Sequence, residues 1–251
     1  MKLALLSDIH GNLQALNACL AHARAQQAQR FAFLGDLVGY GADPCAVVDR
    51  VQLLTEEGAI VLRGNHDVMA LAPPAEVKTV GDSTALWTHQ ALSHAQRGWL
   101  ASLPLVHSMD NILLVHASAN EPDKWRYVYD ERAAAASLDA ASTQYPGTCY
   151  VFGGHVHEQS LYYRVLGASL MKFVPQPGVA VPVPKRRQWL GTIGSVGQPR
   201  DGIPKAMYAL FDTDQARLTF HRVAYDHHGA AAAIRKAGLP EFFAERLEKG
   251  R

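Results

Sequence analysis

The chain has 251 residues, of which 48% are hydrophobic and 19% are charged, and its formal net charge is +1. This length and composition predict an ordinary globular protein with one core, so we expect a single domain over residues 1–251. Proteins that mainly bind nucleic acid usually carry a clear basic excess, and the near-neutral charge therefore argues against a nucleic-acid partner.

The sequence also bears on location. Asp8 ends the first apolar run too early for a secretory leader, and no later run approaches the roughly 20 residues that cross a bilayer. Cys19, Cys45 and Cys149 are odd in number and form no Cys-x-x-Cys pair, which indicates reduced thiols. We expect a cytoplasmic protein without a membrane partner.

Strands and helices are predicted to alternate in the first two-thirds of the chain. Short apolar runs bounded by turn residues favour buried strands at residues 3–6, 31–34, 59–62, 112–115 and 149–152. Apolar positions at three- and four-residue spacing predict helices between them, at residues 13–20, 44–54 and 83–103. This alternation predicts a largely parallel sheet with helices packed on it.

After residue 157 the sequence pattern changes from alternating strands and helices to successive strands. Runs joined by tight Gly/Pro turns predict further strands at residues 160–165, 169–174, 189–194, 205–211 and 217–225. We expect them to form an antiparallel second sheet, packed face to face on the first. A closing helix over residues 230–247 should break at Gly238-Leu239-Pro240. The expected fold class is α/β, a two-sheet β-sandwich flanked by helices.

Each of the five early strands runs directly into a polar cluster that contains Asp, His or Asn. Ligands bind beyond the carboxyl ends of strands in open α/β sheets, so these side chains should converge. Each motif alone is weak evidence, because a strand-end Asp is commonly a helix cap and a single His is commonly a core residue. The candidates together are Asp8, His10, Asp36, Asn65, His66, His116, His155 and His157.

Carboxylate, imidazole and amide oxygen, without thiolate, suit divalent Mn, Fe, Co, Ni or Zn. The set is larger than one metal needs, and two metals that share a carboxylate would use it. In chain order, the sequence resembles the signature of the calcineurin-like metallophosphoesterase superfamily, closest to its small bacterial and archaeal phosphodiesterase-like branch. The resemblance is carried by Asp8-Ile9-His10, Gly35-Asp36, Gly64-Asn65-His66-Asp67, His116, Gly154-His155-Val156-His157, residues 194–200 and Tyr225-Asp226.

The resemblance implies a four-layer sandwich and a centre of two metal ions, with manganese foremost and Fe, Zn, Ni or Co as alternatives. It implies that Asp8, His10, Asp36 and His157 hold one ion. Asp36, Asn65, His116 and His155 would hold the other, so that Asp36 bridges. His66 would then stabilise the transition state or protonate the leaving oxygen, with Asp67 orienting its ring.

Two further residues are candidate substrate contacts. Asn12 opens the first helix, whose free N–H groups face the expected anionic site; a plain N-cap role is the alternative, and the two roles are compatible. Protein phosphatases and symmetrical dinucleotide tetraphosphatases carry a phosphate-binding arginine after Gly-Asp, and residues 37–41 contain none. Arg200 is the candidate replacement, with a solvated loop arginine as the alternative.

The sequence therefore predicts an enzyme that hydrolyses small phosphodiesters or phosphomonoesters, nucleotide-like ones among them, by attack of a metal-held hydroxide. A serine/threonine-type protein phosphatase or a dinucleotide polyphosphate hydrolase is the first alternative. A non-catalytic scaffold is the second, and the retained His66-Asp67 pair argues against it. We also expect residues 68–105 and the 117–130 loop to form a rim around the site, with simple packing of the helices as the alternative.

Overall fold

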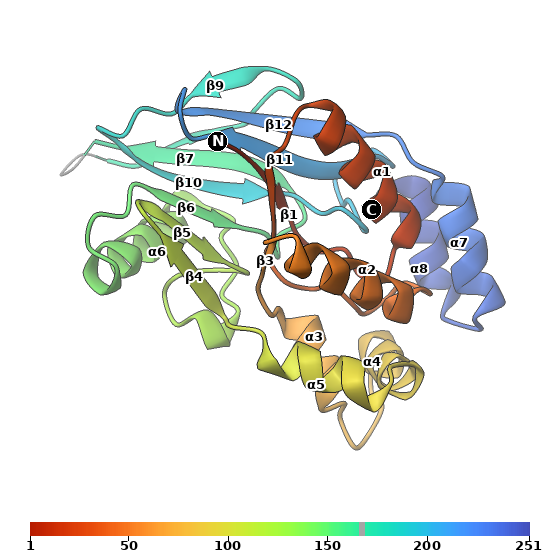
Figure 1. Cartoon of the computed structure of the whole chain (residues 1–251). Coiled ribbons are helices and arrows are strands. Elements are labelled where there is room, and N and C mark those ends of the chain that lie inside the picture. The colour runs from red at the N-terminus through yellow and green to blue at the C-terminus, as the bar shows by residue number, and fades with distance from the viewer. Residues whose placement is uncertain (166–168) are drawn as a thin grey trace.

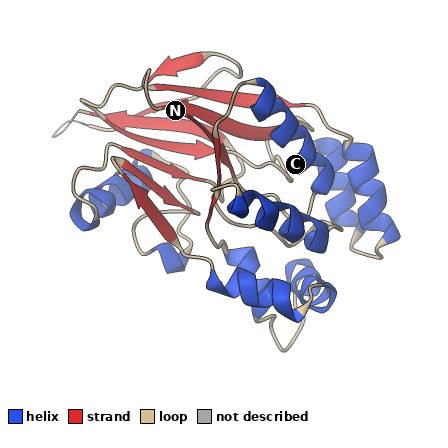
Figure 2. Cartoon of the chain, viewed as in Figure 1, coloured by secondary structure: helices blue, strands red, loops and turns tan. Residues whose placement is uncertain are grey.

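The computed structural model describes residues 1–165 and 169–251, and within these ranges the strands form two six-stranded sheets. The sheets lie face to face, and helices cover the outside (Figure 1). Figure 2 shows the strands gathered in the middle of the molecule with helices on either side. The expected α/β two-sheet sandwich is confirmed.

The first sheet combines strands from both ends of the chain. Its order is β3-β2-β1-β11-β12-β9, with β1–β3 parallel to each other and β1–β11, β11–β12 and β12–β9 paired antiparallel. The strands are β1 (Lys2–Leu6), β2 (Arg30–Phe33), β3 (Ile60–Val61), β9 (Ala180–Pro182), β11 (Ala206–Asp212) and β12 (Arg217–Val223).

The second sheet is mixed as well. Its order is β4-β5-β6-β10-β7-β8, with β5, β6 and β10 parallel and the remaining pairs antiparallel. The strands are β4 (Val106–Met109), β5 (Ile112–Val115), β6 (Tyr150–Gly153), β7 (Gln159–Arg164), β8 (Met171–Phe173) and β10 (Gln188–Ile193). The expectation of one sheet per half of the chain is therefore wrong, because each half contributes strands to both sheets.

Each helix that the sequence pattern predicts is present, with a difference in one place. The predicted helix over 83–103 is two helices, because Leu92 and Ser93 are extended and Ser93 caps the second through Gln96. The closing helix breaks at Gly238-Leu239-Pro240 as predicted. The described helices are α1 (Leu13–Ala25), α2 (Pro44–Glu56), α3 (Asn65–Leu71), α4 (Val80–Ala91), α5 (His94–Ser102), α6 (Glu131–Gln144), α7 (His227–Lys236) and α8 (Glu241–Lys249), with a short 3-10 turn at Pro122–Lys124.

Strand β1 shows why the sandwich needs cover on both sides. Successive side chains of a strand point to opposite faces. Leu3 and Leu5 pack in the core between the sheets, whereas Ala4 and Leu6 pack in the core beneath the helices. All four are fully buried. Among the described helices, none is both long enough and apolar enough to span a bilayer.

Candidate metal centre

Four strands deliver candidate ligands to one edge of the sandwich. The chain reaches Asp8 two residues after β1, Asp36 three residues after β2, His116 directly after β5 and His155 two residues after β6. In the described part of the chain, two groups of ligand atoms result, each within 4.8 Å of one another. They are Asp8, His10 and His157, and Asp36, His116 and His155, all buried.

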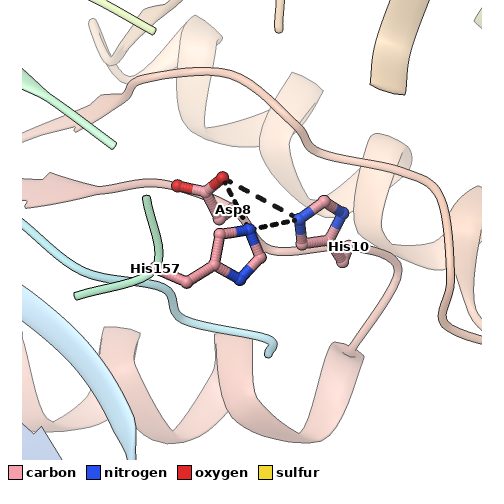
Figure 3. A group of neighbouring side chains, drawn as sticks. All are labelled: Asp8, His10 and His157. Carbon is pink, nitrogen blue, oxygen red and sulfur yellow. Dashed lines mark hydrogen bonds and ion pairs between the residues drawn. The ribbon is translucent and has the colours of Figure 1, made fainter. Parts of the chain in front are cut away.

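The first group joins the beginning of the chain to the loop after β6. Nε2 of His157 lies 3.2 Å from Oδ1 of Asp8 and 3.1 Å from Nε2 of His10. Nε2 of His10 lies 3.8 Å from the same Asp8 oxygen. Figure 3 shows the three side chains pointing at a common point. Three donor atoms this close need a cation between them or a proton on one of the rings.

Asp36 connects the two groups. Its Oδ2 lies 3.4 Å from Nε2 of His116 and 3.8 Å from Nε2 of His10. Oδ1 of Asn65 lies 3.1 Å from Nε2 of His116, which places the amide in the second group. The structure therefore brings together all seven residues that the sequence proposed as ligands, and it puts the Asp36 carboxylate between the two groups.

Backbone carbonyls set the orientation of three of the imidazoles. Nδ1 of His10, His116 and His157 bonds to the carbonyl oxygens of Val38, Leu34 and Gln198, at 3.3, 2.8 and 2.6 Å. A carbonyl only accepts, so each Nδ1 carries the hydrogen and each Nε2 keeps its lone pair toward the centre. This is the tautomer that a metal ligand requires.

Unpartnered buried atoms point to the same chemistry. Asp8 Oδ1, Asp36 Oδ2 and His155 Nε2 have no hydrogen-bond partner among the described residues. A buried polar atom left without a partner costs free energy, and such atoms usually mark a bound water, an ion or a functional site. Carboxylate and imidazole donors without thiolate fit divalent Mn, Fe, Co, Ni or Zn. The residues therefore fit two divalent cations.

The electrostatics keep the donor atoms of Asp8, Asp36 and His155 in the form that binds cations, whereas His116 has to lose a proton to bind one. Burial alone would raise the pKa of Asp8, but His157 outweighs burial and holds that pKa well below its usual range. His116 and His66 do the same for Asp36. Burial lowers the pKa of His155 to about 4, so that ring is neutral. Burial also lowers the pKa of His116, but the Asp36 carboxylate prevails and raises it to about 9.

The backbone at the centre is strained. A positive φ is uncommon outside glycine and clusters at functional sites, since the surrounding structure must hold it. Five of the candidate ligands adopt φ between 49° and 67°: Asp8, His10, Asp36, His155 and His157.

Two glycines let the ligand-bearing segments approach each other. A Cβ on Gly154 would lie 2.1 Å from Oγ of Ser7 and 2.2 Å from Oδ2 of Asp8. A Cβ on Gly64 would lie 2.2 Å from Oδ1 of Asp36. Such contacts are far inside van der Waals distance, so no other residue fits either position without movement. The glycines that precede His155 and Asn65 are thus required by packing.

His66 lies beside the two groups and belongs to neither. It is the second residue of α3, and its ring centroid is 5.0 Å from that of His10 and 4.3 Å from that of Tyr40. Its backbone N–H donates to Oδ1 of Asp36 at 2.8 Å. The side chain is therefore placed next to the centre and held there through the same aspartate that joins the two groups.

Asp67 does not orient His66, and that expectation is corrected. Both oxygens of the buried Asp67 carboxylate accept backbone N–H groups, from Asp36, Leu37, Val38 and Gly64 at 2.8 to 3.2 Å. Burial and the Asp36 carboxylate raise the pKa of Asp67 to about 7, while the N–H groups lower it. Asp67 instead fixes the loop that carries Asp36.

The two candidate substrate residues differ in placement. Oδ1 of Asn12 accepts the Ala15 N–H at 3.0 Å as an N-cap, and its Nδ2 donates to the Gly197 carbonyl at 2.9 Å. Nδ2 also donates to the Tyr225 hydroxyl at 3.4 Å, so a substrate would have to displace that long bond or use the second lone pair of Oδ1. Arg200 is half-buried and its Nη2 donates to Oε1 of Gln198 at 2.9 Å. Arg200 is thus anchored near the centre rather than solvated.

The 117–130 loop reaches the second group. The Tyr127 ring stacks on His155 with centroids 4.0 Å apart, and Trp125 lies 5.7 Å from His116. The sequence pattern assigns no role to Tyr40, Gln198 or Arg246. Arg246 carries no sequence signal, since it is one of several charged residues on an amphipathic helix.

Comparisons with known proteins agree with this geometry. A family model described as calcineurin-like phosphoesterase matches residues 1–159. An uncharacterized protein of Methanocaldococcus jannaschii is 31% identical over 99% of this chain and 98% of its own length. The crystal structure of a metallophosphoesterase from Sphaerobacter thermophilus is 34% identical, with a TM-score of 0.86 over 100% of this chain and 99% of that one.

A more distant similarity covers part of the chain. The symmetrical bis(5'-nucleosyl)-tetraphosphatase of Bordetella pertussis is 34% identical over 45% of this chain and 42% of its own length. The family model matches more than half of the chain, two relatives match it along nearly their whole length, and the buried ligand atoms form two joined groups. The chain belongs to the calcineurin-like phosphoesterase family.

Proposed function

We propose that this protein is a metal-dependent phosphoesterase that hydrolyses small phosphodiesters or phosphomonoesters, nucleotide-like esters among them. The observation that carries the proposal is the pair of buried ligand groups joined by Asp36, in which Asp8 Oδ1, Asp36 Oδ2 and His155 Nε2 have no hydrogen-bond partner among the described residues. Two divalent cations bound there would supply an activated water and neutralise charge on the phosphoryl oxygens. Manganese is the first candidate, and the oxygen and nitrogen donors support it.

The roles of the residues follow from their positions. Asp8, His10 and His157 would hold one cation, Asn65, His116 and His155 the other, and Asp36 both. His66 is 5.0 Å from the His10 ring and outside both groups. It is therefore placed to stabilise the transition state or to give a proton to the leaving oxygen.

The direct test is a reconstitution assay. Protein freed of metal is loaded with Mn, Fe, Co, Ni or Zn and assayed on bis(p-nitrophenyl) phosphate, p-nitrophenyl phosphate and nucleotides. We expect hydrolysis that requires the metal, disappears with chelator and returns when metal is restored. Absence of turnover with every one of these metals on every one of these esters would contradict the proposal and favour the non-catalytic scaffold.

A further inference from the structure

Two arginines from distant parts of the chain meet beside the candidate metal centre. Arg200 lies in the loop between β10 and β11, and Arg246 lies on α8. Both donate to the same atom, Oε1 of Gln198, at 2.9 Å from Arg200 Nη2 and 3.2 Å from Arg246 Nη1. The Gln198 carbonyl also accepts from Nδ1 of His157 at 2.6 Å. One buried residue thus joins the arginines to a candidate ligand.

The pair lacks a counter-charge. Among the described residues, no carboxylate lies within 4.0 Å of either guanidinium, whereas nearby acidic groups are engaged elsewhere. Asp201, next in sequence to Arg200, pairs with Arg222, and Glu245 pairs with Lys249. Two half-buried cations that share one neutral acceptor repel each other. Burial, together with the proximity of Arg200, lowers the pKa of Arg246.

The pair is held in place by the fold. The Arg246 guanidinium lies over the Phe242 ring, 4.4 Å from its centroid. The N–H of Gly202 donates to the Gly250 carbonyl at 2.7 Å, which ties the Arg200 loop to the end of α8. Burial raises the pKa of Tyr40 to about 12, and nearby Arg200 opposes that rise. The Tyr40 ring is in turn 4.6 Å from His10, so the pair adjoins the first ligand group.

We infer that Arg200 and Arg246 form an anion subsite that binds a second phosphate of the substrate, next to the phosphate at the metal centre. The inference rests on the proposed phosphoesterase function and narrows its substrate class to compounds with two or more linked phosphates. Guanidinium groups bind phosphate oxygens through short, charge-assisted and often bidentate hydrogen bonds. A bound phosphate would supply the counter-charge that the pair lacks, and Gln198 would continue to hold the two arginines in place.

The test compares two esters that differ by one phosphate. The substrates are the p-nitrophenyl esters of thymidine 5′-monophosphate and of thymidine 5′-diphosphate. Their hydrolysis by the manganese-loaded enzyme is measured by chromatography. We expect Arg246→Gln to lower the ratio of kcat/KM, diphosphate ester to monophosphate ester, by about tenfold or more, the effect of losing a hydrogen bond to a charged group. The loss should appear mainly in KM, and Arg246→Lys should restore part of it.

A matched control separates charge from helix packing. Arg235 of α7 bonds to Glu241 and Glu248 of α8, so Arg235→Gln loosens α8 without touching the pair. This variant should keep the wild-type ratio of kcat/KM. Binding can also be measured without hydrolysis, by calorimetric titration of the metal-free protein with thymidine 5′-diphosphate. The Arg246→Gln variant should bind this nucleotide more weakly than wild type does.

The outcomes separate the two proposals. If wild-type enzyme hydrolyses neither ester with any metal, the phosphoesterase proposal fails, and calorimetry alone decides on the subsite. If wild-type enzyme hydrolyses both esters but Arg246→Gln leaves their ratio unchanged, the subsite is refuted while the phosphoesterase proposal stands. Equal changes in the Arg235→Gln and Arg246→Gln ratios would also refute it, because α8 packing would then be the cause.

Discussion

The candidate ligands differ in the contacts that orient their side chains. His10, His116 and His157 are oriented by backbone carbonyls, which no side-chain substitution can remove. Their geometry is therefore set before any cation arrives, and binding does not have to order the rings. The Asp36 carboxylate is different, because one oxygen takes the His66 N–H and the other has no hydrogen-bond partner among the described residues. Asp36 is the residue on which both groups depend.

Replacement of that carboxylate should disturb both ions. We expect Asp36→Asn to lower the bound metal from about two ions per chain to about one or fewer, since a bridging ligand serves both. Metal analysis after reconstitution measures this. Asp110→Asn, in the turn between β4 and β5 and away from the centre, is the control and should bind as wild type does. Full activity at a saturating stoichiometry of one ion would overturn the two-ion model.

His66 should behave in the opposite way. His66→Ala should retain metal and thermal stability but lower kcat by roughly 10²–10⁴-fold, the usual contribution of a general acid–base group. The exposed His94, at the start of α5, provides the matched control His94→Ala. Loss of metal in His66→Ala would make His66 a ligand, and full activity would remove it from the chemistry.

At the level of elements, four strand ends were predictable and the pairing of strands was not. The runs before Asp8, Asp36, His116 and His155 each stop at a polar cluster, and that local pattern identifies a strand end. Pairing of β1 with β11 joins residues about 200 positions apart, and no local pattern encodes it. Short strands β4 and β9 lack a distinctive apolar run, and the break between α4 and α5 depends on the Ser93 cap.

The turn after β6 gives a prediction at this scale. Gly154→Ala would place a Cβ against Ser7 and Asp8, forcing the ends of β1 and β6 apart. We expect about 1–3 kcal/mol loss in the free energy of unfolding, the usual cost of overpacking, together with weaker metal binding. Urea unfolding and metal titration measure both effects.

A second glycine provides a control in which the same substitution should raise the free energy of unfolding. Gly98 lies inside α5, and a Cβ there would meet no described atom within 4 Å apart from its chain neighbours and the nearby backbone of its own helix. Gly98→Ala should therefore raise the free energy of unfolding by up to about 1 kcal/mol, because alanine is the better helix former. An equally stable Gly154→Ala would show that the two strand ends can separate freely, contrary to the packing described.

At the level of the whole molecule, both sheets are needed to build one centre. The Asp8 and Asp36 segments come from the first sheet, and the His116 and His155 segments come from the second. The 117–130 loop adds Trp125 and Tyr127 over the second group. Helices α4 and α5 pack on α2 and α3, which favours simple packing for that part of the expected rim. The arginine pair stands beside the first group.

This arrangement predicts selection by substrate size. The aromatic loop and α8 each approach the centre, and the chain has a net charge of only +1, whereas an extended groove for a polyanion needs a basic surface. We expect kcat/KM for bis(p-nitrophenyl) phosphate and nucleotides to exceed by far that for a phosphopeptide or linear DNA. Tyr127→Ala should open the site on the side of the 117–130 loop and so reduce the difference in kcat/KM between the small and the large substrates. Tyr145→Ala, at the end of α6, is the control. Efficient cleavage of linear DNA by protein free of contaminating nuclease would show that the centre is open to long polyanions.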